Sequence, residues 1–278
     1  ATGRGIKIAI VDQGIELTHE DLAPNIYFKS YDAYTGASPS GVYNTASIGH
    51  GTHCAGIAAA VRNNGKFIAG VAPDAKLISV SNNFNASNAN EQLANSINWA
   101  WKNGADIISC SWRAPDSDII RAALDSAIVK GREGKGCIIV KSSGNTGGGI
   151  TFPGSYRKEI IAVGNLQKSG IINSLSCHGD NLLLCAPGTN ILSTMLNNTT
   201  AYKTGTSMAC PHVAGVAALV LERNPKLTAN KVREILAKNT KKVGNMPYNT
   251  TKQYGTWNEY YGFGLINAYK AVINTPRD

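Results

Sequence analysis

The sequence has 278 residues, with 27 Lys and Arg against 18 Asp and Glu, which gives a formal net charge of +9. Hydrophobic residues make up 43% of it, enough for one large core, and no apolar run approaches the roughly 18 residues of a membrane span. The basic residues are scattered and do not alternate with aromatic residues along a stripe, which argues against nucleic acid as a partner.

Short, mostly β-branched apolar runs predict buried strands, and longer runs with apolar residues about four apart predict amphipathic helices. Strands are expected at residues 6–11, 76–80, 106–111, 137–140, 160–164 and 182–188. Helices are expected to start near residues 50, 88, 119, 207 and 228, and a further helix closes the chain. Because strands alternate with helices without a linker or repeat, we predict one α/β domain over residues 1–278. It has a doubly wound, mostly parallel sheet with helices on both faces.

Four polar residues stand at predicted strand ends or helix starts. Asp12 ends the first strand and Asn145 follows a central one, whereas His50 and Ser207 each begin a helix. A serine becomes a nucleophile when an imidazole accepts its proton, and a carboxylate orients that imidazole. An Asn amide and the free N–H groups of a helix start can stabilise an oxyanion. Taken alone, Ser207 also has a simpler interpretation as an N-cap residue.

The histidines and cysteines allow other interpretations. His50 and His53 have a spacing that can bind a metal on a helix, but no third ligand is evident nearby. The six cysteines lack the CxxC pairs of a zinc site, and four stand in apolar or Ala-rich stretches, where a thiol behaves as a small hydrophobe. Cys177 and Cys185 flank a short polar turn and are the pair that a disulfide could join.

Four motifs occur in this order: AIVDQGI at 9–15, HGTHCAG at 50–56, SGN at 143–145 and GTSMACPH at 205–212. Together they resemble the subtilisin-like serine proteases, or subtilases, over residues 2–273, and the order Asp, His, Ser is that of subtilisin. The resemblance implies a serine endopeptidase with peptide or protein substrates. The implied roles are the orienting carboxylate for Asp12, the general acid/base for His50, the nucleophile for Ser207 and the side-chain oxyanion donor for Asn145. It also gives His53 a structural role.

Part of the chain is similar to the kexin/furin branch of this family, notably residues 50–70 and 109–112, although the nucleophile motif is of the general bacterial type. Enzymes of that branch cut after paired basic residues because acids line their pockets. Asp116 lies where one such acid is expected, but Gln13 replaces an acid beside the catalytic Asp and Arg113 replaces a glycine. A buried basic side chain of a substrate needs a paired negative charge, and one acid next to an arginine does not supply it well. Strict cleavage after paired basic residues is therefore not expected.

The resemblance also implies a set of residues that contact substrate. They are Ser109, Ser111, Trp112, Arg113, Asp116, Ser143, Gly144 and Thr151. The strand with Ser109, Ser111, Trp112 and Arg113 is expected to pair with an extended substrate by β-augmentation. The alternatives are an ordinary edge strand and, for Trp112, a core position. Thr151 replaces the family's usual pocket-floor glycine, so we expect a shortened S1 pocket that favours small or medium side chains.

Asp21 and residues 61–68 resemble the family's tight calcium site. Side-chain oxygens of Asp21 and Asn64 and the carbonyls of Val61, Lys66 and Ile68 would supply five ligands, whereas calcium takes about six to eight. The family's remaining ligand lies upstream of the first strand, where this chain is expected to start too late to supply it. The resemblance therefore implies a structural Ca²⁺ at an incomplete site, and the alternative is a solvated Asn-Gly turn.

Two other functions remain open. A subtilase-fold peptide ligase or macrocyclase uses the same acyl-enzyme but usually carries an insertion over its site, and no large insertion is visible. A non-catalytic peptide-binding module predicts the loss of a triad member, and none is lost. The resemblance further implies a secreted or extracytoplasmic protein that is a monomer. Its implied partners, besides substrate, are an N-terminal pro-domain or another subtilase inhibitor. No signal peptide is visible in the chain.

Overall fold

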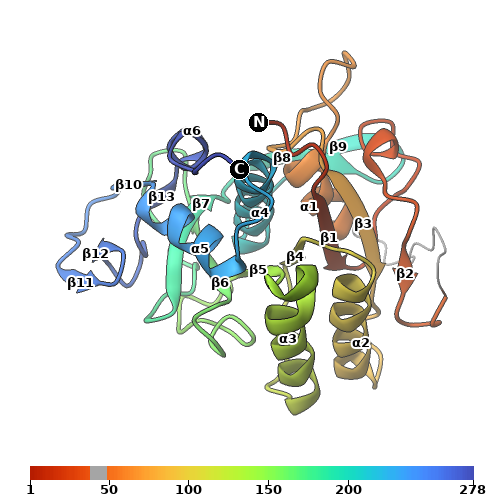
Figure 1. Cartoon of the computed structure of the whole chain (residues 1–278), viewed down its shortest axis with the longest axis horizontal. Coiled ribbons are helices and arrows are strands. Elements are labelled where there is room, and N and C mark those ends of the chain that lie inside the picture. Colours follow the sequence, from red (N-terminus) through yellow and green to blue (C-terminus); the bar gives the residue numbers. More distant parts are fainter. Residues whose placement is uncertain (38–48) are drawn as a thin grey trace.

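The computed structural model describes residues 1–37 and 49–278, and its central feature is a nine-stranded sheet (Figure 1). In spatial order the strands are β10 (Thr240–Lys241), β13 (Leu265–Ile266), β7 (Leu182–Pro187), β6 (Ile161–Leu166), β5 (Ile138–Ser142), β4 (Ile107–Cys110), β1 (Lys7–Asp12), β3 (Lys76–Ser81) and β2 (Tyr31–Asp32). All neighbouring pairs are parallel except β10 and β13. The prediction of a mostly parallel sheet is confirmed.

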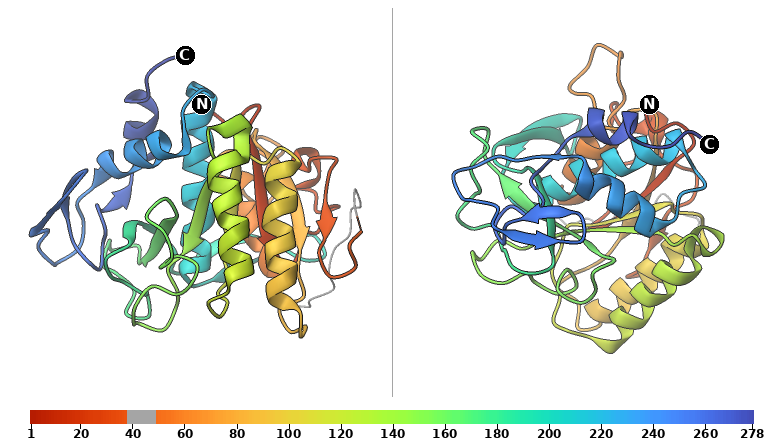
Figure 2. Two further views of the ribbon diagram at one scale, coloured as in Figure 1. Left: turned by 60° about the horizontal axis from the view of Figure 1, so that its bottom comes forward. Right: turned by 60° about the vertical axis from the view of Figure 1, so that its left-hand side comes forward.

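Helices cover both faces of this sheet (Figure 2). One face packs against α2 (Ala89–Lys102) and α3 (Asp118–Lys130). The other packs against α1 (His50–Ala59), α4 (Thr206–Arg223), α5 (Ala229–Lys238) and α6 (Ala268–Ile273). Two short 3-10 helices are η1 (Ala23–Asn25) and η2 (Gly131–Gly134). Because both faces are covered, the central strands are buried along almost their whole length, which explains their near-continuous apolar sequences. The doubly wound α/β fold is confirmed.

The parallel register aligns the carboxyl ends of the central strands. Val11 of β1 pairs with Cys110 of β4, and Cys110 pairs in turn with Lys141 of β5. The residues that follow on β1 and β4, Asp12 and Ser111, therefore stand at the same edge of the sheet. Open α/β folds place their chemistry at this edge.

Two β-hairpins lie outside the main sheet, and the apolar pattern predicts neither. They are β8 (Ile191–Met195) with β9 (Thr199–Lys203), and β11 (Thr250–Lys252) with β12 (Gly255–Trp257). The first packs on α1, where the hydroxyls of Ser193 and Thr194 donate to the carbonyls of His53 and Thr52 at 2.7 and 2.8 Å. Gly56 permits this approach, since a Cβ added there would lie 2.2 Å from the Thr194 hydroxyl oxygen.

The six cysteines are all free and buried. The bridge between Cys177 and Cys185 that the sequence allowed does not form. The Sγ of Cys177 lies 3.1 Å from Oγ1 of Thr146, whereas the Sγ of Cys185 donates to the Tyr260 carbonyl at 3.6 Å. Each thiol therefore has a separate partner.

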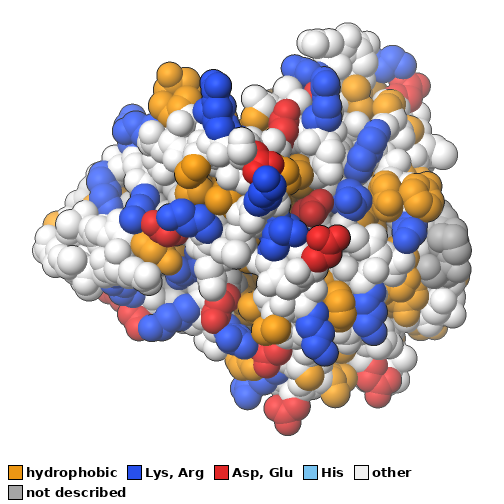
Figure 3. Space-filling view, in the orientation of Figure 1, with side chains coloured by type: hydrophobic (Ala, Val, Ile, Leu, Met, Phe, Trp, Pro, Cys, Tyr) orange, Lys and Arg blue, Asp and Glu red, His pale blue; other side chains and the backbone are white. Residues whose placement is uncertain are grey.

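The surface carries charges of both signs. On the face shown in Figure 3, Lys and Arg side chains are interspersed with Asp, Glu and apolar side chains, without a continuous basic stripe. Among the helices of the described residues, none has both the length and the apolar character that crossing a bilayer requires.

Candidate active site

Asp12 and His50 form a close pair at the carboxyl edge of the sheet. Asp12 is fully buried at the end of β1, and His50 is the first residue of α1. The Nδ1 of His50 lies 2.9 Å from each carboxylate oxygen, and Oδ1 also accepts the main-chain N–H of Gln13 at 2.8 Å. Because a carboxylate can only accept, Nδ1 carries the proton and Nε2 is left as the acceptor.

The pKa values of the two histidines of α1 shift in opposite directions. Burial lowers the pKa of His50, but the charge of Asp12 and the neighbouring Cys54 raise it by more, so that the net pKa lies well above its usual value. A protonated His50 is therefore stabilised in place. His53 is also buried, and burial lowers its pKa to about 4. Its Nε2 lies 3.0 Å from the Ala201 carbonyl of β9, so His53 is a neutral residue between α1 and the β8–β9 hairpin.

Ser207 is the second residue of α4, which begins at Thr206. Its main-chain N–H is therefore one of the donors that have no partner within the helix. Its hydroxyl donates to the Ser111 carbonyl at 3.1 Å, and no hydrogen bond joins it to His50 within residues 1–37 and 49–278.

Pro211 explains why two side chains contact the main chain of Ser207. A proline has no N–H, so the Ser207 carbonyl, four residues earlier, lacks its helical donor. The Ser111 hydroxyl donates to this carbonyl at 2.9 Å and the Cys54 thiol donates at 3.4 Å. Side chains from α1 and from the end of β4 thus hold the first turn of α4 beside the Asp12–His50 pair.

Asn145 is held against the same turn. Its Oδ1 accepts both the main-chain N–H and the hydroxyl of Thr206 at 2.9 Å, and the Thr206 hydroxyl oxygen accepts the N–H of Gly144 at 3.2 Å. With Oδ1 occupied in this way, the Nδ2 donors have no acceptor among the described residues. Gly205 leaves space beside them, since a Cβ there would lie 3.3 Å from Nδ2.

A cavity of about 300 Å³ opens beside Ser207 and Asn145. Five of the residues expected to contact substrate line it, namely Ser111, Trp112, Arg113, Gly144 and Thr151. The first turn of α4 with Ser207, the Asp12–His50 pair and the Asn145 amide thus lie at one edge of the sheet, next to a space for a side chain.

The profile of the Subtilase family matches residues 3–264. The chain belongs to the subtilase family. It is 36% identical to subtilisin DY of Bacillus licheniformis over 97% of this chain and 92% of that protein. It is 37% identical to subtilisin Savinase of Lederbergia lenta over 98% of this chain and 92% of that protein. It is 34% identical to a calcium-dependent protease of a Nostoc species over 97% of this chain, but it covers only 46% of that protein.

Two solved structures support the same assignment. A protease from Pseudoalteromonas arctica matches with a TM-score of 0.81 and 27% identity, covering 99% of this chain and 91% of that one. Fervidolysin from Fervidobacterium pennivorans, a keratinolytic enzyme related to subtilisin, matches with a TM-score of 0.84 and 27% identity, covering 99% and 44%. The chain is a subtilisin-like serine endopeptidase. Its partial likeness to the kexin/furin branch stays a prediction.

The expected substrate-pairing strand begins later in this subtilase than the sequence suggested. Ser109 lies inside β4, paired with Ile10 of β1 and with Val140 of β5, and its hydroxyl lies 3.5 Å from the Cys210 thiol. A strand with neighbours on both sides offers no free edge, so Ser109 is not available to substrate. Only the residues after Cys110 leave the sheet and reach the cavity.

Asp116 and Ser143 also differ from the expectation, because neither lines the cavity. The Asp116 carboxylate is exposed and forms a two-bond ion pair with Arg121 of α3. It is therefore already neutralised by a cation of the protein. Ser143 is fully buried, and its carbonyl accepts the N–H and hydroxyl of Thr151 at 2.9 and 3.2 Å. Its place is to position Thr151.

One residue that lines the cavity was missed by the sequence reasoning. Lys141 is 0% exposed and lies on β5, four residues before Asn145. The available signal was a lysine inside the apolar run 137–142, just before the SGN motif. A charge in a strand that is buried on both faces requires an explanation.

The residues expected to bind calcium gather around Asp21, but their oxygens do not converge. Asp21 is buried, Oδ1 accepts from Nδ2 of Asn64 at 2.6 Å, and Oδ2 accepts the N–H of Ile68 at 2.9 Å. The side-chain oxygen of Asn64 accepts the N–H of Lys66 at 3.1 Å, and the Val61 N–H donates to the Asp21 carbonyl at 2.8 Å. As arranged, N–H groups satisfy the carboxylate, so these residues do not form an oxygen cage.

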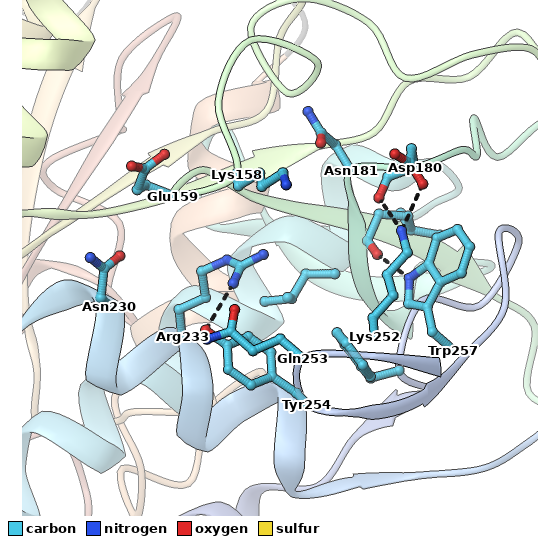
Figure 4. Close-up of a pocket in the computed structure, with 13 residues that line it drawn as sticks. Lys158, Glu159, Asp180, Asn181, Asn230, Arg233, Lys252, Gln253, Tyr254 and Trp257 are labelled. Atoms are coloured by element: carbon cyan, nitrogen blue, oxygen red, sulfur yellow. Dashed lines mark hydrogen bonds and ion pairs between the residues drawn. The ribbon is translucent and has the colours of Figure 1, made fainter. Parts of the chain in front are cut away.

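A larger cavity of about 530 Å³ lies away from Asp12, His50 and Ser207, between α5, the start of β7 and the β11–β12 hairpin (Figure 4). Three of the charged groups that line it, Asp180, Arg233 and Lys252, have partners within the protein. Lys252 pairs with Asp180 at 2.8 Å, and Arg233 donates to the Tyr254 hydroxyl at 3.2 Å. Since Asp12, His50 and Ser207 do not line it, cavity size alone does not identify the candidate active site of this subtilase.

Proposed function

We propose that the chain cleaves peptide bonds through an acyl-enzyme on Ser207. The Ser207 hydroxyl turns from the Ser111 carbonyl toward Nε2 of His50, which accepts the proton as Oγ attacks the scissile carbonyl. Asp12 holds Nδ1–H and stabilises the imidazolium, which then donates its proton to the leaving amine. A water deprotonated by the same nitrogen releases the acyl group. The observation that carries this proposal is the Asp12–His50 pair at 2.9 Å.

Two donors are assigned to the oxyanion of the tetrahedral intermediate. One is the Ser207 main-chain N–H, which has no helical partner at its position in α4. The other is Nδ2 of Asn145, because its Oδ1 is held by two bonds from Thr206. A donor that is already oriented needs no reorganisation when charge develops on the carbonyl oxygen.

The substrate is proposed to lie along residues 111–113, which continue β4 past its last sheet pair at Cys110. Main-chain groups there are free of the sheet and lie beside the cavity. An extended peptide that adds to such a segment gains main-chain hydrogen bonds, while the cavity selects one side chain.

Labelling with a fluorophosphonate tests the nucleophile directly. We expect labelling of the unmodified chain, none of Ser207→Ala, and little of His50→Ala, because the hydroxyl then lacks its proton acceptor. Labelling that survives in Ser207→Ala would refute the assignment. Both variants should also lose most turnover on a peptide substrate.

Product analysis separates hydrolysis from ligation. With a peptide and a competing amine nucleophile in water, a protease releases free acids, whereas a ligase or macrocyclase releases new amides. A peptide-binding module releases neither. We expect free acids, because the cavity is open to water and the triad residues are present.

We also propose that the segment around Asp21 binds a structural Ca²⁺. The support is the likeness to a calcium-dependent protease and the gathering of four expected residues around Asp21. Binding requires the Asn64 amide to turn so that its oxygen replaces its nitrogen. The extracytoplasmic location, the pro-domain or other subtilase inhibitor as partner, and the monomeric state follow from the family resemblance and stay predictions.

A further inference from the structure

Lys141 places a positive charge directly under the cavity beside Ser207. Its side chain is fully buried, and Nζ donates to the carbonyl oxygen of Ser142 at 2.6 Å and to the Ser142 hydroxyl at 2.8 Å. The same nitrogen lies 5.9 Å from the centre of the Trp112 ring, and both residues line the cavity. An ammonium has three donors, so one of them has no acceptor among residues 1–37 and 49–278.

Among the described residues, no negative charge balances Lys141. It forms no ion pair there, and no Asp or Glu is among the described residues that line the cavity. The thiols of Cys110, Cys210 and Cys177 lie close enough to act electrostatically on Lys141. Burial raises the pKa of Cys110 and of Cys210, so these thiols are neutral. A buried charge without a counter-ion costs several kcal/mol, and an apolar residue of similar size would avoid that cost.

Lys141 is nevertheless charged in most molecules at neutral pH. Burial lowers its pKa, but only to about 8. A positive charge thus lies beneath the open cavity, and because Lys141 itself is shielded from water, this charge acts more strongly than one at the surface.

A second donor, on another residue that lines the cavity, also lacks an acceptor among the described residues. The indole N–H of Trp112 is buried and has no hydrogen-bond partner within residues 1–37 and 49–278. Arg113, at the exposed side of the same cavity, adds a second cation. The residues that line the cavity thus carry two positive charges and an unpaired N–H donor, and none of the described lining residues is negatively charged.

We propose that this cavity selects a P1 side chain with a carboxylate, so that the enzyme cleaves preferentially after Glu or Asp. P1 is the residue whose carbonyl Ser207 attacks, and the inference therefore rests on the proposed function. The substrate carboxylate supplies a negative charge close to Lys141, for which the described residues provide no acidic partner. A basic P1 side chain would meet a like charge, and an apolar one would leave the donors unpaired.

The test compares peptides that are identical except for P1, with Glu, Gln, Leu or Lys at that position. We expect kcat/KM for the Glu peptide to exceed that for the nearly isosteric Gln peptide about 10- to 100-fold, as for one charge-assisted contact. Lys141→Met removes the charge and keeps the length of the side chain, and should bring this ratio to about 1. Equal values for Glu and Gln in the unmodified enzyme would overturn the proposal.

Two matched variants identify the responsible charge. Lys130→Met removes an exposed lysine of α3 and should leave the ratio unchanged, which controls for net charge. Arg113→Gln should reduce the ratio less than Lys141→Met, because an exposed charge is screened by water. A ratio that depends on Arg113 and not on Lys141 would overturn the role of the buried lysine.

The pH dependence gives a readout that does not require the variant to fold. Because Lys141 loses its charge as pH rises through about 8, the Glu-to-Gln ratio of the unmodified enzyme should fall over that range. A merely structural lysine would leave the ratio constant, and a constant ratio would count against the proposal. Fluorophosphonate labelling of Ser207 distinguishes failure of the P1 proposal from failure of the proposed function. Labelling without a Glu preference refutes only the P1 preference, whereas no labelling refutes the proposed function itself.

Discussion

The turn that carries Ser207 provides a prediction about how Pro211 is accommodated. Because Pro211 lacks an N–H, the Ser207 carbonyl relies on the Ser111 hydroxyl at 2.9 Å and on the weaker Cys54 thiol at 3.4 Å. Ser111→Ala removes the stronger donor. Pro211→Ala restores a main-chain N–H at the position that would normally bond this carbonyl. The two substitutions should therefore not act independently.

The expected magnitude follows from the donors that remain. A buried carbonyl left without a donor costs about 1–3 kcal/mol, and the Cys54 thiol persists as a weak donor, so Ser111→Ala should cost about 1–2 kcal/mol. For a domain of this size that corresponds to a decrease in Tm of about 2–8 °C. In the Pro211→Ala background the carbonyl has its helical donor, and the same change should cost less than about 0.5 kcal/mol.

The assay is thermal unfolding of the four proteins of this double-mutant cycle, all carrying Ser207→Ala to prevent self-digestion. Circular dichroism and calorimetry give Tm and the unfolding enthalpy from which the free energies are compared. Equal losses from Ser111→Ala in the two backgrounds would refute the reasoning, since they would show that Ser111 does not substitute for the missing N–H.

Three further predictions concern the oxyanion donor, the general base and the cation. Asn145→Ala should lower kcat about 100- to 1000-fold, the range known for removing such a donor from subtilisin. Asn145→Asp should lower it further, because the variant keeps the acceptor for Thr206 but sets a negative charge against the oxyanion. His50 must be unprotonated to accept a proton, and its pKa is raised, so kcat/KM should fall as pH decreases, with a midpoint above 6.5. Millimolar Ca²⁺ should raise the Tm of the unmodified chain relative to a chelator, and should not raise that of Asp21→Asn. At a hundredfold excess over Kd, the free energy of unfolding of the unmodified chain should increase by about 2.7 kcal/mol.

Each of these has a contrary outcome. A loss of kcat below about threefold in Asn145→Ala would mean that this amide does not contact the oxyanion. An acid limb centred at or below 6.5 would contradict the dominance of the Asp12 charge over burial at His50. The same Tm with calcium and with a chelator would refute calcium binding at Asp21. That result would agree with the N–H groups that already bond its carboxylate.

Much of the fold was predictable because the pattern of apolar residues along a segment reflects which of its side chains are buried. The strand expected at 6–11 is β1 at Lys7–Asp12, and the helix expected from residue 119 is α3 at Asp118–Lys130. Thr228 caps α5 as expected, with its hydroxyl oxygen accepting the N–H of Lys231 at 3.2 Å. The short hairpins β8–β9 and β11–β12 escaped prediction because the buried residues of β8, Ser193 and Thr194, are polar, and because β9 and β11 carry no clear apolar period.

The sequence by itself determined which residues stand at strand ends and helix starts, and with the family motifs it identified Asp12, His50, Asn145 and Ser207 as candidates. A residue's neighbours along the chain are enough for this, since apolar period and capping are local. Only the tertiary structure decided that Ser109 is inside a central strand while Ser111 contacts Ser207.

Tertiary structure also decided the contents of the cavity. Lys141 belongs to β5, Trp112 follows β4 and Ser207 begins α4, and the parallel register together with the packing of α4 brings them to one edge. No local pattern shows that a lysine in an apolar strand will lie under a substrate pocket without a counter-ion. Pairing between strands that are distant in sequence sets that position, and with it the charge that a substrate side chain meets.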